Sequence, residues 1–159
     1  MNQQPPQVEV VIEIPRGSFL KWGSCGRVDF VSPFPCPFNY GSVRAYVGGD
    51  DDLLDAVVLG PRLPRGKHVN VAAHGAVGFT DRGIYDDKLI CSHRPLGPLC
   101  RQLVLFFFNF YAVCKRLLNI YRGRGGGRTV CEGWGAAELA ISRARPRKDT
   151  KWSGPVIPF

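Results

Sequence analysis

The chain has 159 residues, enough for one ordinary domain and too few for two sizeable ones. Its hydrophobic share of 45% and charged share of 21% exclude a disordered chain, and 19 glycines with 13 prolines disfavour a helix bundle. Residues 1–60 carry 7 acidic and 4 basic side chains, whereas residues 61–159 carry 6 acidic and 17 basic ones, within a net charge of +8. This asymmetry suits a site that holds metal ions together with an anion, and the alternative is a basic, solvated tail.

The first half of the chain predicts short strands. A loose arm is expected over residues 1–7, and residues 8–14 predict the first strand, because they are rich in β-branched residues and end at Pro15. A polar loop is expected over residues 80–87. The other expected strands cover residues 19–22, 27–31, 42–47, 55–59, 68–79 and 88–91.

A long helix is expected from Pro98 to about Asn119. Leu105, Phe108 and Ala112 lie off its main apolar face and are also apolar, so the helix is expected to be deeply buried or to lie at a subunit interface. The main face, with apolar residues at alternating steps of four and three, comprises Leu99, Leu103, Phe106, Phe110, Val113 and Leu117.

A second helix is expected over residues 135–145, followed by a C-terminal tail over residues 146–159. A run of strands followed by helices predicts a single domain of the α+β class, with a barrel or a strongly bent sheet as its core.

The cysteines and the N-terminus predict a cytoplasmic protein with reduced thiols. The six cysteines form no CxxC pair and no zinc-like group with histidine, and residues 1–6 lack the basic and apolar regions of a secretory signal. The longest nearly apolar run, residues 103–114, is interrupted by Asn109 and is shorter than the ~20 residues that span a bilayer. No membrane partner is therefore expected.

Two groups of carboxylates could carry chemistry. In extended backbone Asp50 and Asp52 point to the same side, and Asp55 can return to the same pocket after a turn. Asp81 and Asp86 lie in the loop expected between two strands. Such oxygen ligands suit magnesium or manganese, and together the two groups offer enough carboxylates for two or more metal ions. Taken separately, each group is more often a solvated turn or a surface loop.

Seven short elements follow one another in a distinctive order. They are Val11-Ile12-Glu13-Ile14-Pro15, Lys21, Pro37-Phe38-Asn39-Tyr40-Gly41, Asp50-x-Asp52-x-x-Asp55, Asp81-(four residues)-Asp86-x-Lys88, Phe107-Phe108-x-x-Tyr111 and Glu132-Gly133-Trp134. In order and internal spacing they resemble the soluble family I inorganic pyrophosphatases over about residues 8–134. The fourth element alone is weakly specific, whereas the seven in order are highly specific.

The resemblance implies a small closed five-stranded β-barrel of the OB type with flanking helices. It implies Mg²⁺-dependent hydrolysis of pyrophosphate to two phosphates, with Mn²⁺ or another divalent ion as an alternative, in a homo-oligomer that is usually a hexamer. The implied site residues are Asp52 as the base that activates water, Asp50, Asp55, Asp81 and Asp86 as metal ligands with Glu13 in the outer part of the metal site, and Lys21, Tyr40, Lys88 and Tyr111 as phosphate-binding residues.

The chain also departs from this family pattern. Asp51 stands where the family has Gly, which fits if the position is left-handed, and Leu53 replaces a Pro and loosens the turn. The family's Arg in the strand after Lys21 has no match, and its Lys directly after the helix Tyr is Ala112 here. The candidate replacements for these two cations are Arg16, Arg27, Lys115 and Arg128.

Two other functions stay open on the sequence. The missing cations favour a pyrophosphatase homologue with weakened or lost catalysis that binds an anion or a partner. An OB-type barrel with a glycine–arginine loop at residues 122–128 could instead bind nucleic acid. This loop is short and lacks interleaved aromatic residues, so a nucleic-acid partner is not expected.

Overall fold

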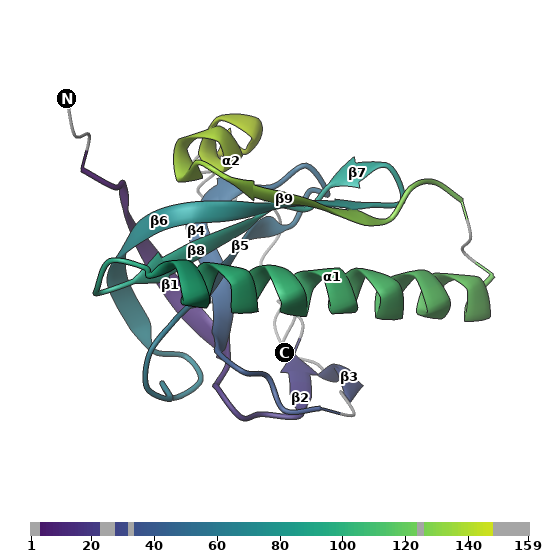
Figure 1. Cartoon of the computed structure of the whole chain (residues 1–159), viewed down its shortest axis with the longest axis horizontal. Coiled ribbons are helices and arrows are strands. Elements are labelled where there is room, and N and C mark those ends of the chain that lie inside the picture. The colour runs from purple at the N-terminus through teal and green to yellow at the C-terminus, as the bar shows by residue number, and fades with distance from the viewer. Residues whose placement is uncertain (1–3, 23–27, 32–33, 124–125, 148–159) are drawn as a thin grey trace, which may run out of the picture.

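A computed structural model describes residues 4–22, 28–31, 34–123 and 126–147, in which a β-barrel carries two helices (Figure 1). The strands are β1 (Gln7–Ile14), β2 (Leu20–Trp22), β3 (Val28–Val31), β4 (Asn39–Val47), β5 (Leu53–Val58), β6 (His68–Asp81), β7 (Ile84–Tyr85), β8 (Lys88–Ser92), β9 (Val130–Gly135) and β10 (Arg145–Pro146), and the helices are α1 (Pro98–Tyr121) and α2 (Ala137–Arg143).

Five strands close the barrel in the order β1-β4-β5-β8-β6, and β1 also pairs with β6. Neighbouring strands are antiparallel except β5 and β8, which run parallel. β7 and β9 extend the sheet from β6, β10 pairs with β4, and β2 and β3 form a separate two-stranded sheet. The α+β class and the closed five-stranded barrel with flanking helices are therefore confirmed.

The region expected as a polar loop is a tight hairpin. β6 continues to Asp81 and pairs with β7, with Thr80 opposite Tyr85. The two residues between these strands, Arg82 and Gly83, both have positive φ, at 50° and 81°. Such backbone matches the twist of a two-residue hairpin turn, and the hairpin extends the sheet beyond the expected end of the strand.

The chain ends and β9 also differ from expectation. The arm expected over residues 1–7 is partly paired, because Gln7 opens β1 and the Pro6 carbonyl accepts a hydrogen bond from the Ala73 N–H at 2.9 Å. Strand β9 was not expected. Its last residue, Gly135, was expected to begin the second helix, but α2 begins at Ala137. Residues 145–146 pair with β4 as β10, and the Arg147 N–H donates a hydrogen bond to the Ala45 carbonyl at 2.8 Å. The expected tail from residue 148 on lies outside the described residues.

Alternate side chains of the barrel wall belong to two separate apolar clusters. In β5, Ala56 and Val58 pack in the cluster that includes Ala140 of α2, whereas Val57 packs in the cluster that includes Phe108 of α1. This alternation is the period of two expected of a strand that is buried on both sides. The two helices therefore cover opposite sides of the barrel wall, as Figure 1 shows.

Helix α1 packs on the barrel through a different face from the one with the most regular apolar spacing. Val104, Phe108 and Ala112 are buried, and the Phe108 ring stacks on Phe38 with centroids 6.0 Å apart. By length and composition alone, α1 is the described helix that is apolar enough to cross a membrane, although this side of it packs on the barrel. The main face expected from the sequence is exposed in this chain, at Leu99, Leu103, Phe106, Phe110, Val113 and Leu117.

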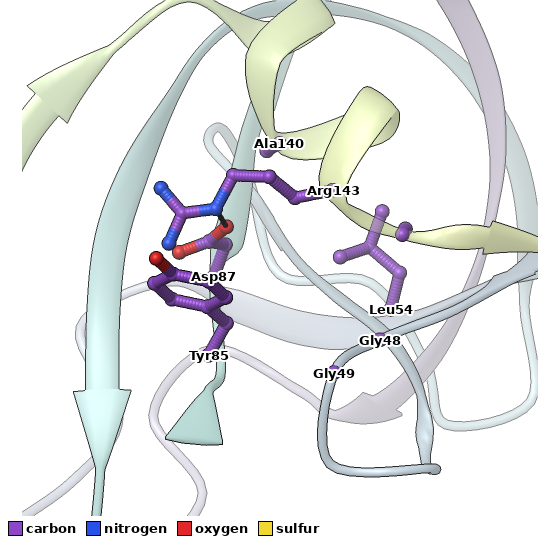
Figure 2. Close-up of a pocket in the computed structure, with 8 residues that line it drawn as sticks. Gly48, Gly49, Leu54, Tyr85, Asp87, Ala140 and Arg143 are labelled. Carbon is purple, nitrogen blue, oxygen red and sulfur yellow. Dashed lines mark ion pairs between the residues drawn. The ribbon is translucent and has the colours of Figure 1, made fainter. Parts of the chain in front are cut away.

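A small pocket lies where α2 meets the hairpin (Figure 2). The Arg143 guanidinium lies 3.6 Å from the centroid of the Tyr85 ring, and its Nε is 3.1 Å from Asp87 Oδ2. Asp87 Oδ1 accepts a hydrogen bond from the Phe79 N–H at 3.1 Å. This carboxylate therefore ties α2 and β6 together.

Candidate active site

A buried lysine joins two of the predicted carboxylates. The parallel register of β5 and β8 sets Asp55 opposite Lys88, whose Nζ lies 2.6 Å from Asp55 Oδ2 and also donates to Asp86 Oδ1. The Lys88 side chain is 2% exposed. Burial disfavours its charged form, but the charges of Asp55 and Asp86 outweigh burial and raise the pKa of Lys88, so the ammonium stays charged.

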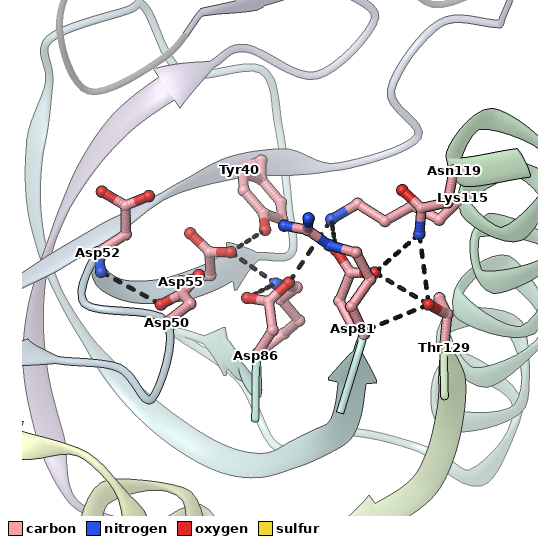
Figure 3. Close-up of polar contacts among 11 residues, drawn as sticks. Tyr40, Asp50, Asp52, Asp55, Asp81, Asp86, Lys115, Asn119 and Thr129 are labelled. Carbon is pink, nitrogen blue, oxygen red and sulfur yellow. Dashed lines mark hydrogen bonds and ion pairs between the residues drawn. The ribbon is translucent and has the colours of Figure 1, made fainter. Parts of the chain in front are cut away.

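Tyr40 completes this centre from the neighbouring strand. Its hydroxyl donates a hydrogen bond to Asp55 Oδ2 at 2.5 Å (Figure 3). Burial, together with the negative charges of Asp55 and Asp86, raises the pKa of Tyr40 well above its usual value. The hydroxyl is therefore a hydrogen-bond donor at any physiological pH. Burial also raises the pKa of Asp86, although the charge of Lys88 opposes this shift.

Asp81, at the end of β6, is held by three donors (Figure 3). Its Oδ2 lies 2.7 Å from Lys115 Nζ, and its Oδ1 accepts hydrogen bonds from Thr129 Oγ1 at 3.0 Å and Asn119 Nδ2 at 3.2 Å. Burial would raise the pKa of Asp81, but the hydrogen bond and charge of Lys115 together with the other two donors lower it. Asp81 is therefore ionised at neutral pH and paired with a cation.

Asp50 and Asp52 lie on the exposed turn before β5, at the Asp55 end of the row of carboxylates in Figure 3. The Asp52 N–H donates to Asp50 Oδ1 at 3.2 Å. Between them Asp51 has a φ of 67°, so this position is left-handed, a conformation that Asp adopts more readily than most other residues. The Asp51 carboxylate forms an ion pair with Arg145 of β10.

Glu13 lies at an irregularity in β1. Its neighbours Ile12 and Ile14 pair with the adjacent residues Gly41 and Tyr40, so the register between β1 and β4 shifts at Glu13. Its Oε1 accepts a hydrogen bond from Ser42 Oγ at 2.7 Å.

The two remaining predicted phosphate-binding residues are Tyr111 and Lys21. Tyr111 of α1 packs its ring against Phe79, with centroids 5.7 Å apart, and beneath Lys115 Nζ, which lies 5.8 Å from the Tyr111 ring centroid. Lys21 pairs through its backbone with Phe30 of β3, and its side chain lies outside what the structure describes.

Three residues that bond to Asp81 were not among the predicted site residues: Lys115, Asn119 and Thr129. Lys115 was one of four candidate cations, and Asn119 and Thr129 were missed. Tyr111, Lys115 and Asn119 recur at steps of four, which puts them on one helix face, so the sequence held a signal for Asn119. Thr129 precedes β9, whose pairing with β6 the sequence did not indicate.

The other candidate cations include Arg16 and Arg27. Arg16 Nη1 donates to the Gly60 carbonyl at 3.0 Å, and Arg27 lies outside the described residues. Lys115 is a candidate that the structure brings to the predicted carboxylates, at Asp81.

The carboxylates of the site are of the chemical type that binds a divalent ion such as Mg²⁺. Asp55 and Asp86 already converge on one cation, the ammonium of Lys88, and hard carboxylate oxygens are the ligands that Mg²⁺ prefers. Among the described residues, no three His, Cys, Asp or Glu side chains are grouped closely enough to hold a metal ion. The carboxylates instead form ion pairs with lysines: Asp55 with Lys88, and Asp81 with Lys115.

Comparison with known proteins decides the family. A family model described as inorganic pyrophosphatase matches residues 10–100. The chain belongs to the inorganic pyrophosphatase family. An inorganic pyrophosphatase from Neisseria meningitidis serogroup A is 30% identical over 154 residues, which cover 84% of this chain and 82% of that protein. The soluble inorganic pyrophosphatase 2 of Chlamydomonas reinhardtii is 39% identical over 106 residues, or 58% of this chain and 52% of that one.

Solved structures of inorganic pyrophosphatases share the fold. The crystal structure of an inorganic pyrophosphatase from Neisseria gonorrhoeae matches with a TM-score of 0.68 at 28% identity and covers 86% of both chains. The inorganic pyrophosphatase of Thermus thermophilus matches with the same TM-score at 24% identity over 90% of both chains, which shows the fold alone. The resemblance drawn from seven sequence elements is confirmed.

Proposed function

We propose that this protein hydrolyses inorganic pyrophosphate to two phosphates, with Mg²⁺ as its cofactor and Mn²⁺ or another divalent ion as an alternative. The observation that carries the proposal is the row of carboxylates Asp55, Asp81 and Asp86, which adjoins buried Lys88 and Tyr40 in a family member. Pyrophosphate is a polyanion that repels a nucleophile, so its hydrolysis requires positive charge around the reacting phosphorus. The site combines ligands for cations with fixed donors for phosphate oxygens.

The acidic residues would hold the ions and take a proton. Divalent ions bound there would neutralise the polyanion and lower the pKa of a bound water toward ~7. Asp52, which is exposed on the turn before β5, would accept the proton of that water at a carboxylate oxygen. The ligands of the ions would be Asp50, Asp55, Asp81 and Asp86, with Glu13 in the outer part of the site.

The basic and hydroxyl residues would bind phosphate. Lys88 would supply a fixed positive charge, and Tyr40 a hydroxyl whose raised pKa keeps it protonated. Tyr111, beside this centre on α1, and Lys21 would add donors to the phosphate that leaves.

The proposal is tested by phosphate release from pyrophosphate over a Mg²⁺ titration. We expect release that depends on Mg²⁺ and that is lost when a chelator is added. Glu138→Gln, which removes an exposed carboxylate of α2 outside the site, is the control variant and should hydrolyse as wild type does. A folded protein without release at any Mg²⁺ concentration would contradict the proposal.

A second function is favoured by the ion pairs. Lys88 and Lys115 already neutralise the carboxylates, which fits a homologue that binds an anion or a partner with weak catalysis or none. Calorimetric titration separates the two functions, because such a homologue would bind pyrophosphate without releasing phosphate.

We further propose that the protein is a cytoplasmic homo-oligomer, a hexamer, with α1 near an interface. The exposed apolar stripe of α1 supports this assembly, since Phe106 is 75% exposed and soluble monomers rarely leave large apolar patches uncovered. Light scattering should give six times the chain mass of 17.6 kDa for wild type. Phe106→Glu should lower this mass, whereas Leu139→Glu on α2 should not. A 17.6 kDa wild-type species would contradict the assembly and favour cover by residues 152–159, outside the described residues.

A further inference from the structure

Lys115 places a second ammonium group among the predicted metal ligands. Its Nζ lies 2.7 Å from Asp81 Oδ2 and 3.9 Å from Asp86 Oδ2, so one cation stands between two carboxylates. These oxygens belong to two of the four carboxylates expected to hold divalent ions. The same pair of carboxylates therefore has two candidate cations, one built into the chain and one from solution.

The second half of α1 fixes this arrangement. Lys115 lies one helical turn after Tyr111, and its ammonium group lies over the Tyr111 ring. Asn119 lies one turn further on, and its side-chain amide donates a hydrogen bond to Asp81 Oδ1. Thr129 Oγ1 donates to the same oxygen. Asp81 is thus held with Oδ1 toward the helix end and strand β9, and with Oδ2 toward Lys115.

The two lysines of the site differ in their freedom to leave it. Lys88 is 2% exposed, on strand β8 of the closed barrel, and bonds to two carboxylates. The Lys115 side chain is 24% exposed and reaches the site from a helix surface, with four rotatable carbon bonds between its backbone and its charge. Lys115 can therefore swing into water while Lys88 stays in place.

We propose that Lys115 is a resident cation that competes with a divalent ion for the Asp81–Asp86 pair. The inference rests on the proposed function, because it takes these carboxylates as metal ligands. A divalent ion that binds Asp81 Oδ2 must displace the ammonium, and an ammonium only a few ångströms away repels a divalent ion even in water. The chain thus weakens its own affinity for one divalent ion, and metal binding frees a positively charged side chain at the rim of the site.

The experiment is calorimetric titration of Mn²⁺ into the full-length protein without substrate. Lys115→Met removes the charge and keeps most of the apolar stem. Arg116→Met is the matched control, because it removes one charge from the adjacent, exposed position of the same helix. Lys115→Arg keeps the charge. Circular dichroism confirms that each variant is folded.

We expect Lys115→Met to bind Mn²⁺ at least ~10-fold more tightly than wild type, or to bind one more ion, since its carboxylates have lost their competitor. Arg116→Met and Lys115→Arg should stay near wild type. Equal or weaker Mn²⁺ binding by Lys115→Met overturns the proposal, as does an equal gain in Arg116→Met. Phosphate release by wild type, measured separately, reports whether the proposed function itself fails.

Discussion

The ion pair at the centre of the site makes a sharp prediction about stability. Lys88 is 2% exposed, and its partners Asp55 and Asp86 are 25% and 12% exposed. Replacing Lys88 by Met keeps the volume of the side chain but leaves two carboxylates without their cation. Removing one partner of a buried ion pair costs ~3–5 kcal/mol. With a urea m-value on the order of 2 kcal/mol/M, the unfolding midpoint should fall by about 2 M at pH 7.

The pH dependence identifies the cause of this loss. Burial already raises the pKa of Asp86, and without the charge of Lys88 the pKa of Asp86 should rise further. A carboxyl whose folded-state pKa is raised favours the folded state only when protonated, so the variant recovers stability as pH falls through the raised pKa. The difference in the free energy of unfolding between variant and wild type should therefore be smaller at pH 5 than at pH 7.

The assay is urea unfolding followed by circular dichroism at one protein concentration, with no divalent ion present. Exposed Lys67→Met is the matched control and should change the free energy of unfolding by less than ~0.5 kcal/mol. A loss below ~1 kcal/mol in Lys88→Met at pH 7, or a loss that does not change with pH, would show that the carboxylates do not depend on Lys88.

Other substitutions test the roles of individual carboxylates. Asp52→Asn should keep the fold and most metal binding but lower turnover by a factor on the order of 10²–10⁴, and near wild-type turnover would assign the base elsewhere. Asp55→Asn and Asp86→Asn should each raise the Mg²⁺ concentration needed for half-maximal phosphate release, and Ca²⁺ should support little hydrolysis because its looser coordination misplaces water and leaving group. Asp51→Gly should leave activity unchanged or raise it, and a large loss would make Asp51 a required ligand.

Local patterns predicted the barrel strands well because those strands carry their own signal. Residues 8–14 are β-branched and end at a proline, and they appear as β1 with one more residue. Strand β9 has no such signal, because it contains Gly133 and Gly135 and forms by pairing with β6. A strand that is stabilised mainly by pairing with its neighbour cannot be recognised from the strand propensities of its own residues.

The helix shows the same limit for packing. Apolar spacing predicted that α1 is apolar over most of its circumference, which is correct, but the most regular stripe is the exposed one. The buried face of α1 is the one that packs on aromatic side chains of the barrel. Phe108 contacts Phe38, and Tyr111 contacts Phe79. Periodicity finds apolar faces, and only the shape of the partner surface selects between them.

The departures from the family pattern show how distant parts of the chain compensate one another. Asp51 adds a negative charge to the turn that carries Asp50 and Asp52, and Arg145, 94 residues later, pairs with it. Ala112 removes a positive charge from α1, and Lys115 brings one back to Asp81 from the next turn of the helix. Both departures make the site more negative in the local sequence, and in each case the fold brings a positive charge from another part of the chain. A departure within a motif therefore predicts lost chemistry only after the neighbours that the fold supplies have been counted.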